Sequence, residues 1–304
     1  MSVSNEINRL INAKAAIKQS IVNKGVDVSD SALLDEYPAL IDSISGSGGV
    51  DPFYRTMWNA MTNNNTDYSY LFFRSKATKL DFSNLDTSNV ADMSYMFQYC
   101  QSLTDSDVSN FNTSKVTNMY SMFANCNKLT SLDMSNWDTR NVTSMGAMFN
   151  QCSKLTSLDV SNFNTNKVTG MNMMFYYCSS LETIDVSNFD TSNVTDIGYV
   201  FSNCSKLAAL DVSNWDISKV TNNSYLGSAF NNCAALIDFQ APKNISANMD
   251  VSNSKALSHD SLMSIINNLI TVTSSKTLTL GSTNLAKLTA DEIAIATNKG
   301  WTVK

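Results

Sequence analysis

A unit of 26 residues recurs without slippage through the middle of this chain. Its most recognisable dipeptide is Ser-Asn, which stands at 83–84, 109–110, 135–136, 161–162, 187–188 and 213–214. A strict period in this range predicts a solenoid, in which each unit forms one coil stacked on the preceding coil. Because one coil cannot bury its inner face alone, the repeated apolar positions must line a continuous interior.

Each coil holds a stretch with strand spacing and then a stretch with helical spacing. In the coil at 129–150, Leu132 and Met134 lie two apart, so a strand would direct both toward the core. The next apolar residues are three and four apart, which predicts a short helical turn. In this coil they are Val142, Met145, Met148 and Phe149. The expected fold is an α/β-type repeat solenoid of stacked coils with parallel strands.

Two columns of the repeat predict structural ladders. One is an asparagine at each bend, whose amide can donate and accept hydrogen bonds at once. The other is one cysteine per coil, a spacing that suits neither disulfides nor Cys-x-x-Cys metal sites and therefore predicts buried free thiols. The columns are Asn110, Asn136, Asn162, Asn188 and Asn214, and Cys100, Cys126, Cys152, Cys178, Cys204 and Cys233. Ser106 stands where Leu or Ile is expected, which predicts a loosely packed coil.

The unit LDVSNFDTSNVTDMxxMFxxC resembles the BspA-type leucine-rich repeat over about residues 80–237. Proteins with this repeat occur on the surfaces of gut and oral bacteria and in phage tails. The resemblance implies a leucine-rich-repeat-like parallel solenoid that mediates adhesion or recognition.

The regions outside the repeat predict helical and capping units. The first contains an amphipathic helix for docking or oligomerisation, whose apolar residues are Ile7, Leu10, Ile17 and Ile21. The predicted boundaries are 1–45 for this helical segment, 46–50 for a flexible linker, 51–79 for a degenerate capping coil, 80–240 for the solenoid and 241–304 for an α+β C-terminal cap. In the degenerate coil, Leu71 is expected at the position of Phe97, and Arg74 at that of Cys100. In the C-terminal cap, spacing predicts a helix over 258–270, a strand over 277–281, and a second helix beginning with a Thr289–Glu292 capping box.

Residues 13–44 are similar to N-terminal segments of phage tail fibre proteins. That resemblance implies docking to other virion or tail proteins and a homo-oligomer, with a trimer as the implied number. The alternative is a small helical cap for the solenoid. The beginning of the chain, MSVSNEINRLINAKAAIKQS, lacks the uninterrupted apolar core of a secretory signal, which favours a virion protein over a bacterial surface adhesin.

Composition argues against several functional classes. The net charge is −6 with 21 basic residues and no basic cluster, so nucleic-acid binding is not expected. No apolar run approaches the length that a membrane-spanning helix needs, so no membrane insertion is expected. The single histidine, His259, precedes a predicted helix and is expected to be exposed or capping. No catalytic motif is present, and we expect neither an enzyme nor a cofactor or metal.

Two columns of charged and polar residues resemble ligand-binding or catalytic sites. The first lies outside the core by strand alternation and consists of Asp81, Asp107, Asp133, Asp159, Asp185 and Asp211. Its unvarying repetition favours a solvated or hydrogen-bonding ladder over a calcium site or a glycosidase pair. The second alternates amide with cation, as Asn89, Lys115, Asn141, Lys167, Asn193 and Lys219. This alternation relieves like-charge repulsion and predicts pairs between neighbouring coils.

The coils differ most around the Met-Phe pair, where tyrosines gather. They are Tyr95, Tyr99, Tyr120, Tyr176, Tyr177, Tyr199 and Tyr225. Exposed tyrosines are good recognition residues, because they combine a large contact area with a polar tip. The alternative is that several pack against adjacent coils.

The sequence therefore favours a non-enzymatic, tail-associated or receptor-binding phage protein located in the virion. Its solenoid would recognise a protein or glycan on the host surface. The alternatives are a bacterial cell-surface adhesin of the same repeat family and a purely structural virion component.

Overall fold

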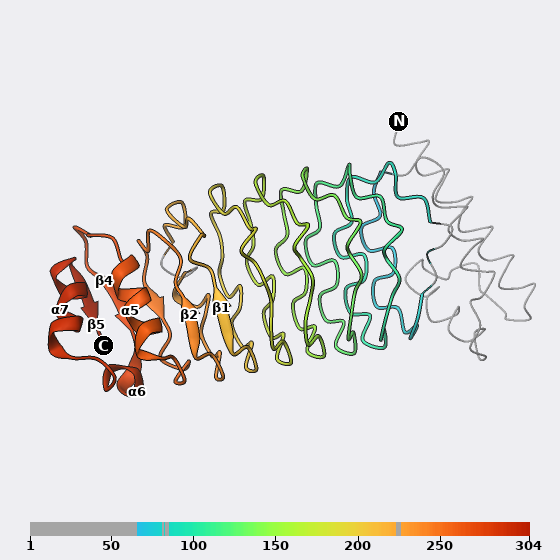
Figure 1. Cartoon of the computed structure of the whole chain (residues 1–304). Helices are drawn as coiled ribbons and strands as arrows, with labels where there is room; N and C mark the ends of the chain where they lie inside the picture. Colours follow the sequence, from blue (N-terminus) through green and yellow to red (C-terminus); the bar gives the residue numbers. More distant parts are fainter. Residues whose placement is uncertain (1–65, 81, 83–84, 223–225) are drawn as a thin grey trace, which may run out of the picture.

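The computed structural model describes residues 66–80, 82, 85–222 and 226–304. These residues form an elongated solenoid whose coils stack along one axis, with the C-terminal cap at one end (Figure 1). The predicted helical segment at 1–45, with Ile7, Leu10, Ile17 and Ile21, lies outside the described residues, as do the linker and Tyr225.

The interior of the solenoid is a continuous apolar core. One phenylalanine per coil stacks on its neighbour along the axis, with ring centroids 5.0 Å apart for Phe97–Phe123 and 5.9 Å apart for Phe123–Phe149. The methionines of the repeat, such as Met145 and Met148, are fully buried beside this column. The core predicted from the repeat is therefore confirmed.

The strand half of each coil forms less regular strand pairing with neighbouring coils than the sequence suggests. Leu132 is partly buried and Met134 is buried, while Ser131 and Asp133 point outward, as alternation predicts. Regular parallel pairing between coils, however, is confined to β1 (Ala209–Asp211) and β2 (Asp238–Gln240). Elsewhere the described coils from 66 to 208 are joined by isolated bridges such as Ser144↔Gly170.

The prediction of a short helical turn is wrong. In the segment 119–126, alternate residues donate their N–H groups to carbonyls of the next coil, namely Met119, Ser121, Phe123 and Asn125. Met122, Ala124 and Cys126 instead close tight turns with bonds to the third preceding residue. An α-helix would satisfy those groups internally. Spacings of three and four fit both arrangements, and the stacked coils favour the one that joins them.

The first described coil has a register different from the predicted one. Phe72, not Leu71, takes the place of Phe97 and stacks on it at 5.3 Å. Ser75 takes the place of Cys100, because its N–H bonds Phe72 O as that of Cys100 bonds Phe97 O. Arg74 therefore corresponds to Tyr99. The spacing between these first two coils is one residue shorter than the repeat, which the strict period of the later coils conceals.

The asparagine and cysteine columns are structural, as predicted. Asn162 Nδ2 donates to the carbonyls of Met134 and Trp137, both at 2.9 Å. All six cysteines are buried free thiols whose Sγ atoms lie against carbonyl oxygens of the preceding coil, for example Cys152 Sγ to Phe123 O at 3.2 Å. Burial raises the pKa of the Cys178 thiol to about 12, so this thiol stays protonated and unreactive.

The C-terminal cap closes the core with helices and a second parallel sheet. Helix α5 (His259–Asn268) covers the last coil and buries Leu262, Ile265 and Ile266. The sheet has the order β3-β4-β5, and helices α6 and α7 complete the cap. These elements are β3 (Met249–Asp250), β4 (Lys276–Thr279), α6 (Gly281–Leu285), α7 (Ala290–Asn298) and β5 (Trp301–Val303). The predicted capping box of Thr289 and Glu292 is present; α6 was not predicted.

Ser106 is buried, and its Oγ has no hydrogen-bond partner among the described residues. The equivalent residues Leu158 and Leu210 are buried. We expect Ser106→Leu to raise the free energy of unfolding by about 1–2 kcal/mol, because it adds buried apolar area and removes an unpaired hydroxyl. Urea unfolding measures the effect, with Leu158→Ser as the reverse control. A loss of stability would show that this coil has no room for the larger side chain.

Candidate functional site: the tyrosine edge

The tight-turn segments carry a line of tyrosines, which we call the tyrosine edge. Its described members are Tyr70, Tyr95, Tyr99, Tyr120, Tyr176, Tyr177 and Tyr199. Tyr70 is 51% exposed, Tyr177 46%, Tyr199 40% and Tyr99 38%, whereas the other three are partly buried. Tyr70 was missed from sequence because the one-residue register difference in the first coil hid its alignment with Tyr95.

Most of these tyrosines have left-handed backbone conformations. Positive φ recurs at two positions per coil, four residues apart. Tyr95 and Tyr99 are such a pair, with φ values of 59° and 63°. Tyr177 occupies the second position of its coil with φ 58°, and Tyr199 the first position of the next coil with φ 59°. In other coils the second position, that of Tyr99 and Tyr177, holds Asn125 and Asn203, the residue type best suited to positive φ after glycine. A tyrosine at such a position carries a conformational cost that packing does not repay when the ring is exposed.

One aromatic patch lies at the N-terminal end of the described solenoid. Tyr70 and Tyr95 stack with centroids 4.5 Å apart, and Tyr120 meets Tyr95 edge-on at 5.4 Å. Burial, followed by the neighbouring Tyr70 and Tyr120, raises the pKa of Tyr95, so its hydroxyl stays protonated. These rings pack along the axis, as the packing alternative predicts, and still expose part of their surface.

A second patch lies three to four coils further along. Tyr176 meets Tyr177 edge-on at 5.0 Å and Tyr199 at 5.7 Å. Between the patches the edge carries small residues, because Gly146 and Ala147 occupy the positions of Tyr120 and Ser121. A Cβ at Gly146 would lie 2.9 Å from the Tyr120 ring and 2.6 Å from Asn172 Oδ1, so a larger residue there would force these side chains to shift. The tyrosine edge thus consists of two aromatic patches separated by a coil without tyrosine.

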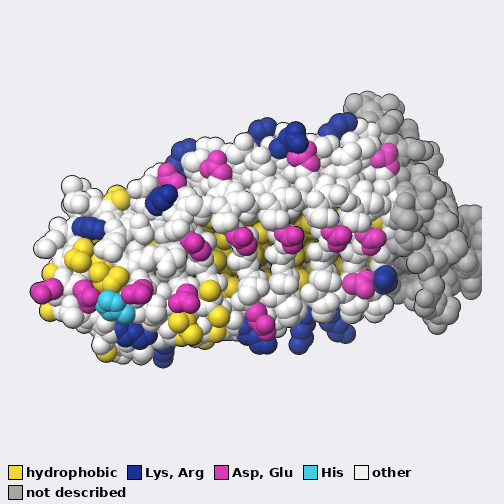
Figure 2. Space-filling model, viewed as in Figure 1, with side chains coloured by type: hydrophobic (Ala, Val, Ile, Leu, Met, Phe, Trp, Pro, Cys, Tyr) yellow, Lys and Arg dark blue, Asp and Glu magenta, His cyan; other side chains and the backbone are white. Residues whose placement is uncertain are grey.

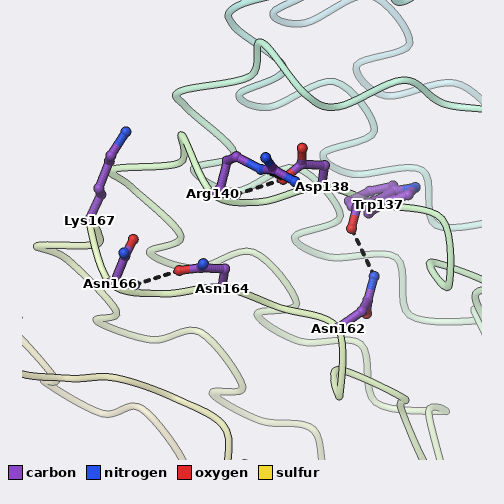
Figure 3. Close-up of a pocket in the computed structure, with 7 residues that line it drawn as sticks. All are labelled: Trp137, Asp138, Arg140, Asn162, Asn164, Asn166 and Lys167. Atoms are coloured by element: carbon purple, nitrogen blue, oxygen red, sulfur yellow. Dashed lines mark hydrogen bonds and ion pairs between the residues drawn. The ribbon is translucent and has the colours of Figure 1, made fainter.

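A shallow pocket of about 550 Å³ lies away from these tyrosines (Figure 3). Its lining residues are Trp137, Asp138, Arg140, Asn162, Asn164, Asn166 and Lys167. Their polar groups largely pair with one another: Arg140 Nε lies 2.8 Å from Asp138 Oδ1, and the Asn166 N–H donates to Asn164 Oδ1. Because this chemistry is already satisfied within the fold, the pocket supports a structural role.

The predicted alternation of amide and cation makes pairs between coils. Lys115, Lys167 and Lys219 donate to the side-chain oxygens of the asparagines one coil earlier, at 2.6, 2.8 and 2.7 Å. Asn141 in turn donates to Ser114 O of the coil before it. These bonds hold the register of the stack and do not form a ligand site.

Acidic side chains run in a row along one face of the solenoid (Figure 2). In the column predicted from sequence, Asp107, Asp133, Asp159, Asp185 and Asp211 each accept from the N–H of the serine two residues later. Hydrogen bonds from Ser135 lower the pKa of Asp133, which therefore stays ionised. Among the described residues, no group of three or more His, Cys, Asp or Glu side chains could hold a metal ion.

His259 begins α5, and its Nε2 lies 2.8 Å from Glu292 Oε1 of α7. Hydrogen bonds to Glu292 and Asp260 raise the pKa of His259 above its ordinary 6.5, while the Thr289 N–H and His259 lower that of Glu292 below 4.5. The raised pKa of His259 stabilises the fold below about pH 6.5, and this stability is lost as pH rises. The lowered pKa of Glu292 stabilises the fold above about pH 4.5, and this stability is lost as pH falls. The pair therefore stabilises the cap most between these values.

We expect Glu292→Gln to lower the pKa of His259 toward its ordinary value, since the amide carries no charge. NMR titration of the imidazole is unambiguous, because the chain has one histidine. Asp260→Asn, which removes the more distant 3.5 Å contact, is the control and should lower the pKa less. Equal effects would show that the shorter contact, to Glu292, is not the dominant one.

No helix among the described residues is both long and apolar enough to span a bilayer.

The comparisons with known proteins concern the repeat. The family model described as Mycoplasma protein of unknown function, DUF285, matches residues 66–158 and 143–260. The search of curated proteins finds no match.

Solved structures that match this chain include a T. pallidum leucine-rich repeat protein, which has a TM-score of 0.42 and 19% identity over 64% of this chain and 84% of that one. Another is a leucine rich cell surface protein of Faecalibacterium prausnitzii A2-165, with a TM-score of 0.22 and 16% identity over 62% of this chain and 68% of that one. A third is the TLR13–ssRNA13 complex, with a TM-score of 0.29 and 15% identity over 70% of this chain and 37% of that one. Similarity at this level does not extend to function.

Proposed function

Because this chain belongs to the family described as Mycoplasma protein of unknown function, DUF285, we propose that it is a non-enzymatic recognition protein of the bacterial cell surface. The tyrosine edge would bind a partner on another cell. The matching family model is described as a Mycoplasma protein, and this bacterial source supports a cell-surface location over the virion.

One observation carries the proposal: exposed tyrosines occupy left-handed positions where asparagine would be more stable. Tyr99, Tyr177 and Tyr199 each carry this conformational cost in the isolated chain. Backbone strain of about 1–3 kcal/mol per residue clusters at binding sites, where the contact made by the side chain compensates for it. Tyrosine is also enriched among residues that dominate binding energy.

We expect the triple variant Tyr99→Asn, Tyr177→Asn and Tyr199→Asn to lose at least about tenfold in affinity for target cells, since each such contact is worth about 2 kcal/mol at an interface hot spot. Its thermal stability should be unchanged or higher, because asparagine tolerates positive φ. Flow cytometry with labelled protein measures binding, and calorimetry measures unfolding.

The matched control is Asp133→Asn, Asp159→Asn and Asp185→Asn on the acidic column, which changes three exposed side chains elsewhere on the coils. It should bind like the wild type. Equal binding by the tyrosine variant and the wild type would overturn the proposed role of the tyrosine edge.

The second candidate is a phage tail-associated protein, which the similarity of residues 13–44 to tail fibre segments favours. In that case the N-terminal segment would dock to other tail proteins or form a homo-oligomer. Mass spectrometry of purified virions and of cell-envelope fractions separates the two: detection in virions supports the tail hypothesis, and detection only in the envelope supports the cell-surface hypothesis.

A further inference from the structure

A cation, Arg74, lies beside the tyrosine edge at its N-terminal end, and this indicates what the edge binds. We propose that the tyrosine edge, if it serves recognition as proposed above, binds an extended acidic polysaccharide, with Arg74 contacting an anionic group of that chain. The shared chemistry is a carboxylate, sulfate or phosphate carried on saccharide units.

Arg74 is held between aromatic rings. Its guanidinium carbon lies 5.0 Å from the centroid of Phe73 and 5.5 Å from that of Tyr99. The two rings themselves meet edge-on at 5.8 Å. Stacking of this kind orients a guanidinium while leaving its N–H groups free to bond an anion in bidentate fashion.

Among the described residues, Arg74 also differs from Arg140 in having no carboxylate partner. Within the part of the chain that the structure describes, no carboxylate lies within 4.0 Å of Arg74, whereas Arg140 pairs with Asp138 at 2.8 Å. Arg74 is exposed and adopts a left-handed φ of 60°, so it carries the same backbone cost as the tyrosines. An oriented cation with no carboxylate partner among the described residues, at the end of an aromatic patch, is suited to an anionic ligand.

The second patch supplies aromatic faces and hydroxyls, and the cation–π contacts of the described residues, both made by Arg74, lie outside it. Tyr177 stands three coils beyond Tyr99, which is about 14 Å at the usual spacing between parallel strands. Between the patches, Gly146 and Ala147 add no large side chain of their own to the edge. A linear ligand touching both patches gains affinity from each contact.

A saccharide fits this surface better than a peptide. The exposed groups are separate tyrosine faces and hydroxyls on an open edge, which can stack on the faces of sugar rings and bond their hydroxyls. A bound peptide would need unpaired backbone groups to add a strand, and those of the tight-turn segments already bond the neighbouring coils.

The test uses the full chain and three polymers with one backbone: dextran, carboxymethyl-dextran and dextran sulfate. A phosphorylated dextran adds the third anion. Calorimetry should show binding to at least one anionic polymer and at least tenfold weaker binding to dextran. Arg74→Gln should weaken the anionic interaction at least tenfold, since it removes charged hydrogen bonds to the ligand, and should leave any dextran binding unchanged.

Arg140→Gln is the control, because it removes one exposed arginine with the same change of net charge and should bind like the wild type. Equal losses in both variants would show a non-specific charge effect and overturn the inference. Binding of dextran and its anionic forms with equal affinity would also overturn it, while leaving the proposed recognition function standing. If no polymer binds but cells still bind through the tyrosines, the ligand is a protein and the inference fails alone.

Discussion

Truncating one ring in the middle of the solenoid, with Phe149→Ala, should lower the free energy of unfolding by about 3–5 kcal/mol. Phe149 is fully buried and stacks on Phe123 at 5.9 Å and on Phe175 at 5.8 Å. The variant removes the ring contacts on both sides and leaves a cavity, which coils held by inter-coil hydrogen bonds can close only in part. A loss of this size is a large share of the stability of a typical domain.

The position of the truncation matters as much as its size. Solenoid coils contact only their neighbours, so a defect in a central coil weakens the coupling between the two halves. We expect the urea transition of Phe149→Ala to broaden as well as shift, because the halves then unfold less cooperatively. Trp137 and Trp215 lie in different coils, so variants that keep only one of the four tryptophans, Trp137 or Trp215, report on the two halves by fluorescence.

Phe230→Ala provides the comparison near the C-terminal cap. Phe230 stacks on Phe201 at 6.4 Å and meets Phe239 at a tilt. Its loss should destabilise the protein without splitting the transition, because only the last coils lie beyond it. A sharp, unshifted transition for Phe149→Ala would mean that the core collapses around the missing ring, and would contradict a rigid stacked interior.

The repeat predicts the stacking, the core and the ladders, because each follows from the period and from which residues recur. Asn162 and Cys152 are examples: a polar residue that recurs at a bend must satisfy backbone groups, and a lone small thiol per coil must pack. The capping box of Thr289 and Glu292 was equally predictable, since it depends only on local spacing.

The prediction for the turn segments was wrong for a physical reason. Spacings such as Met145 to Met148 describe which residues face inward, and both a helix and a ladder of tight turns satisfy them. The choice depends on hydrogen bonds to the next coil, such as Met145 N–H to Gly170 O, which no local pattern specifies.

The candidate site was predicted only in outline for the same reason. Sequence located most of the tyrosines but not their positive φ values, which arise from the tight turns. It also gave no reason to single out Arg74, whose place between Phe73 and Tyr99 depends on the shortened spacing between the first two coils.

The asparagine ladder provides the second large effect. Asn162→Asp should lower the free energy of unfolding at neutral pH by about 3 kcal/mol, although the two side chains are nearly identical in shape. The Asn162 amide donates to three carbonyls of the preceding coil, namely those of Met134, Ser135 and Trp137, at 2.9, 3.3 and 2.9 Å. An ionised aspartate has no donor, so it would place negative charge against these oxygens and leave them unpaired.

The pH dependence identifies the cause. Facing carbonyl oxygens in a partly buried site would raise the pKa of the new carboxyl in the folded state. A group with a raised folded pKa binds its proton more tightly in the native state, so the stability lost at neutral pH should partly return as pH falls through that pKa. The protonated acid can donate one of the missing bonds. Urea unfolding of wild type and variant, compared at each pH, measures this recovery.

Asn136→Asp is the matched control, because Asn136 is exposed and donates to one carbonyl, Ser109 O at 3.2 Å. Its cost should be well below that of Asn162→Asp and should depend little on pH. If the two variants lost the same stability, the number of carbonyls held by the amide would not be what matters. If Asn162→Asp failed to recover at low pH, the cause would be steric. The predicted difference follows only if the ladder stabilises the solenoid by donating hydrogen bonds to the coil before it.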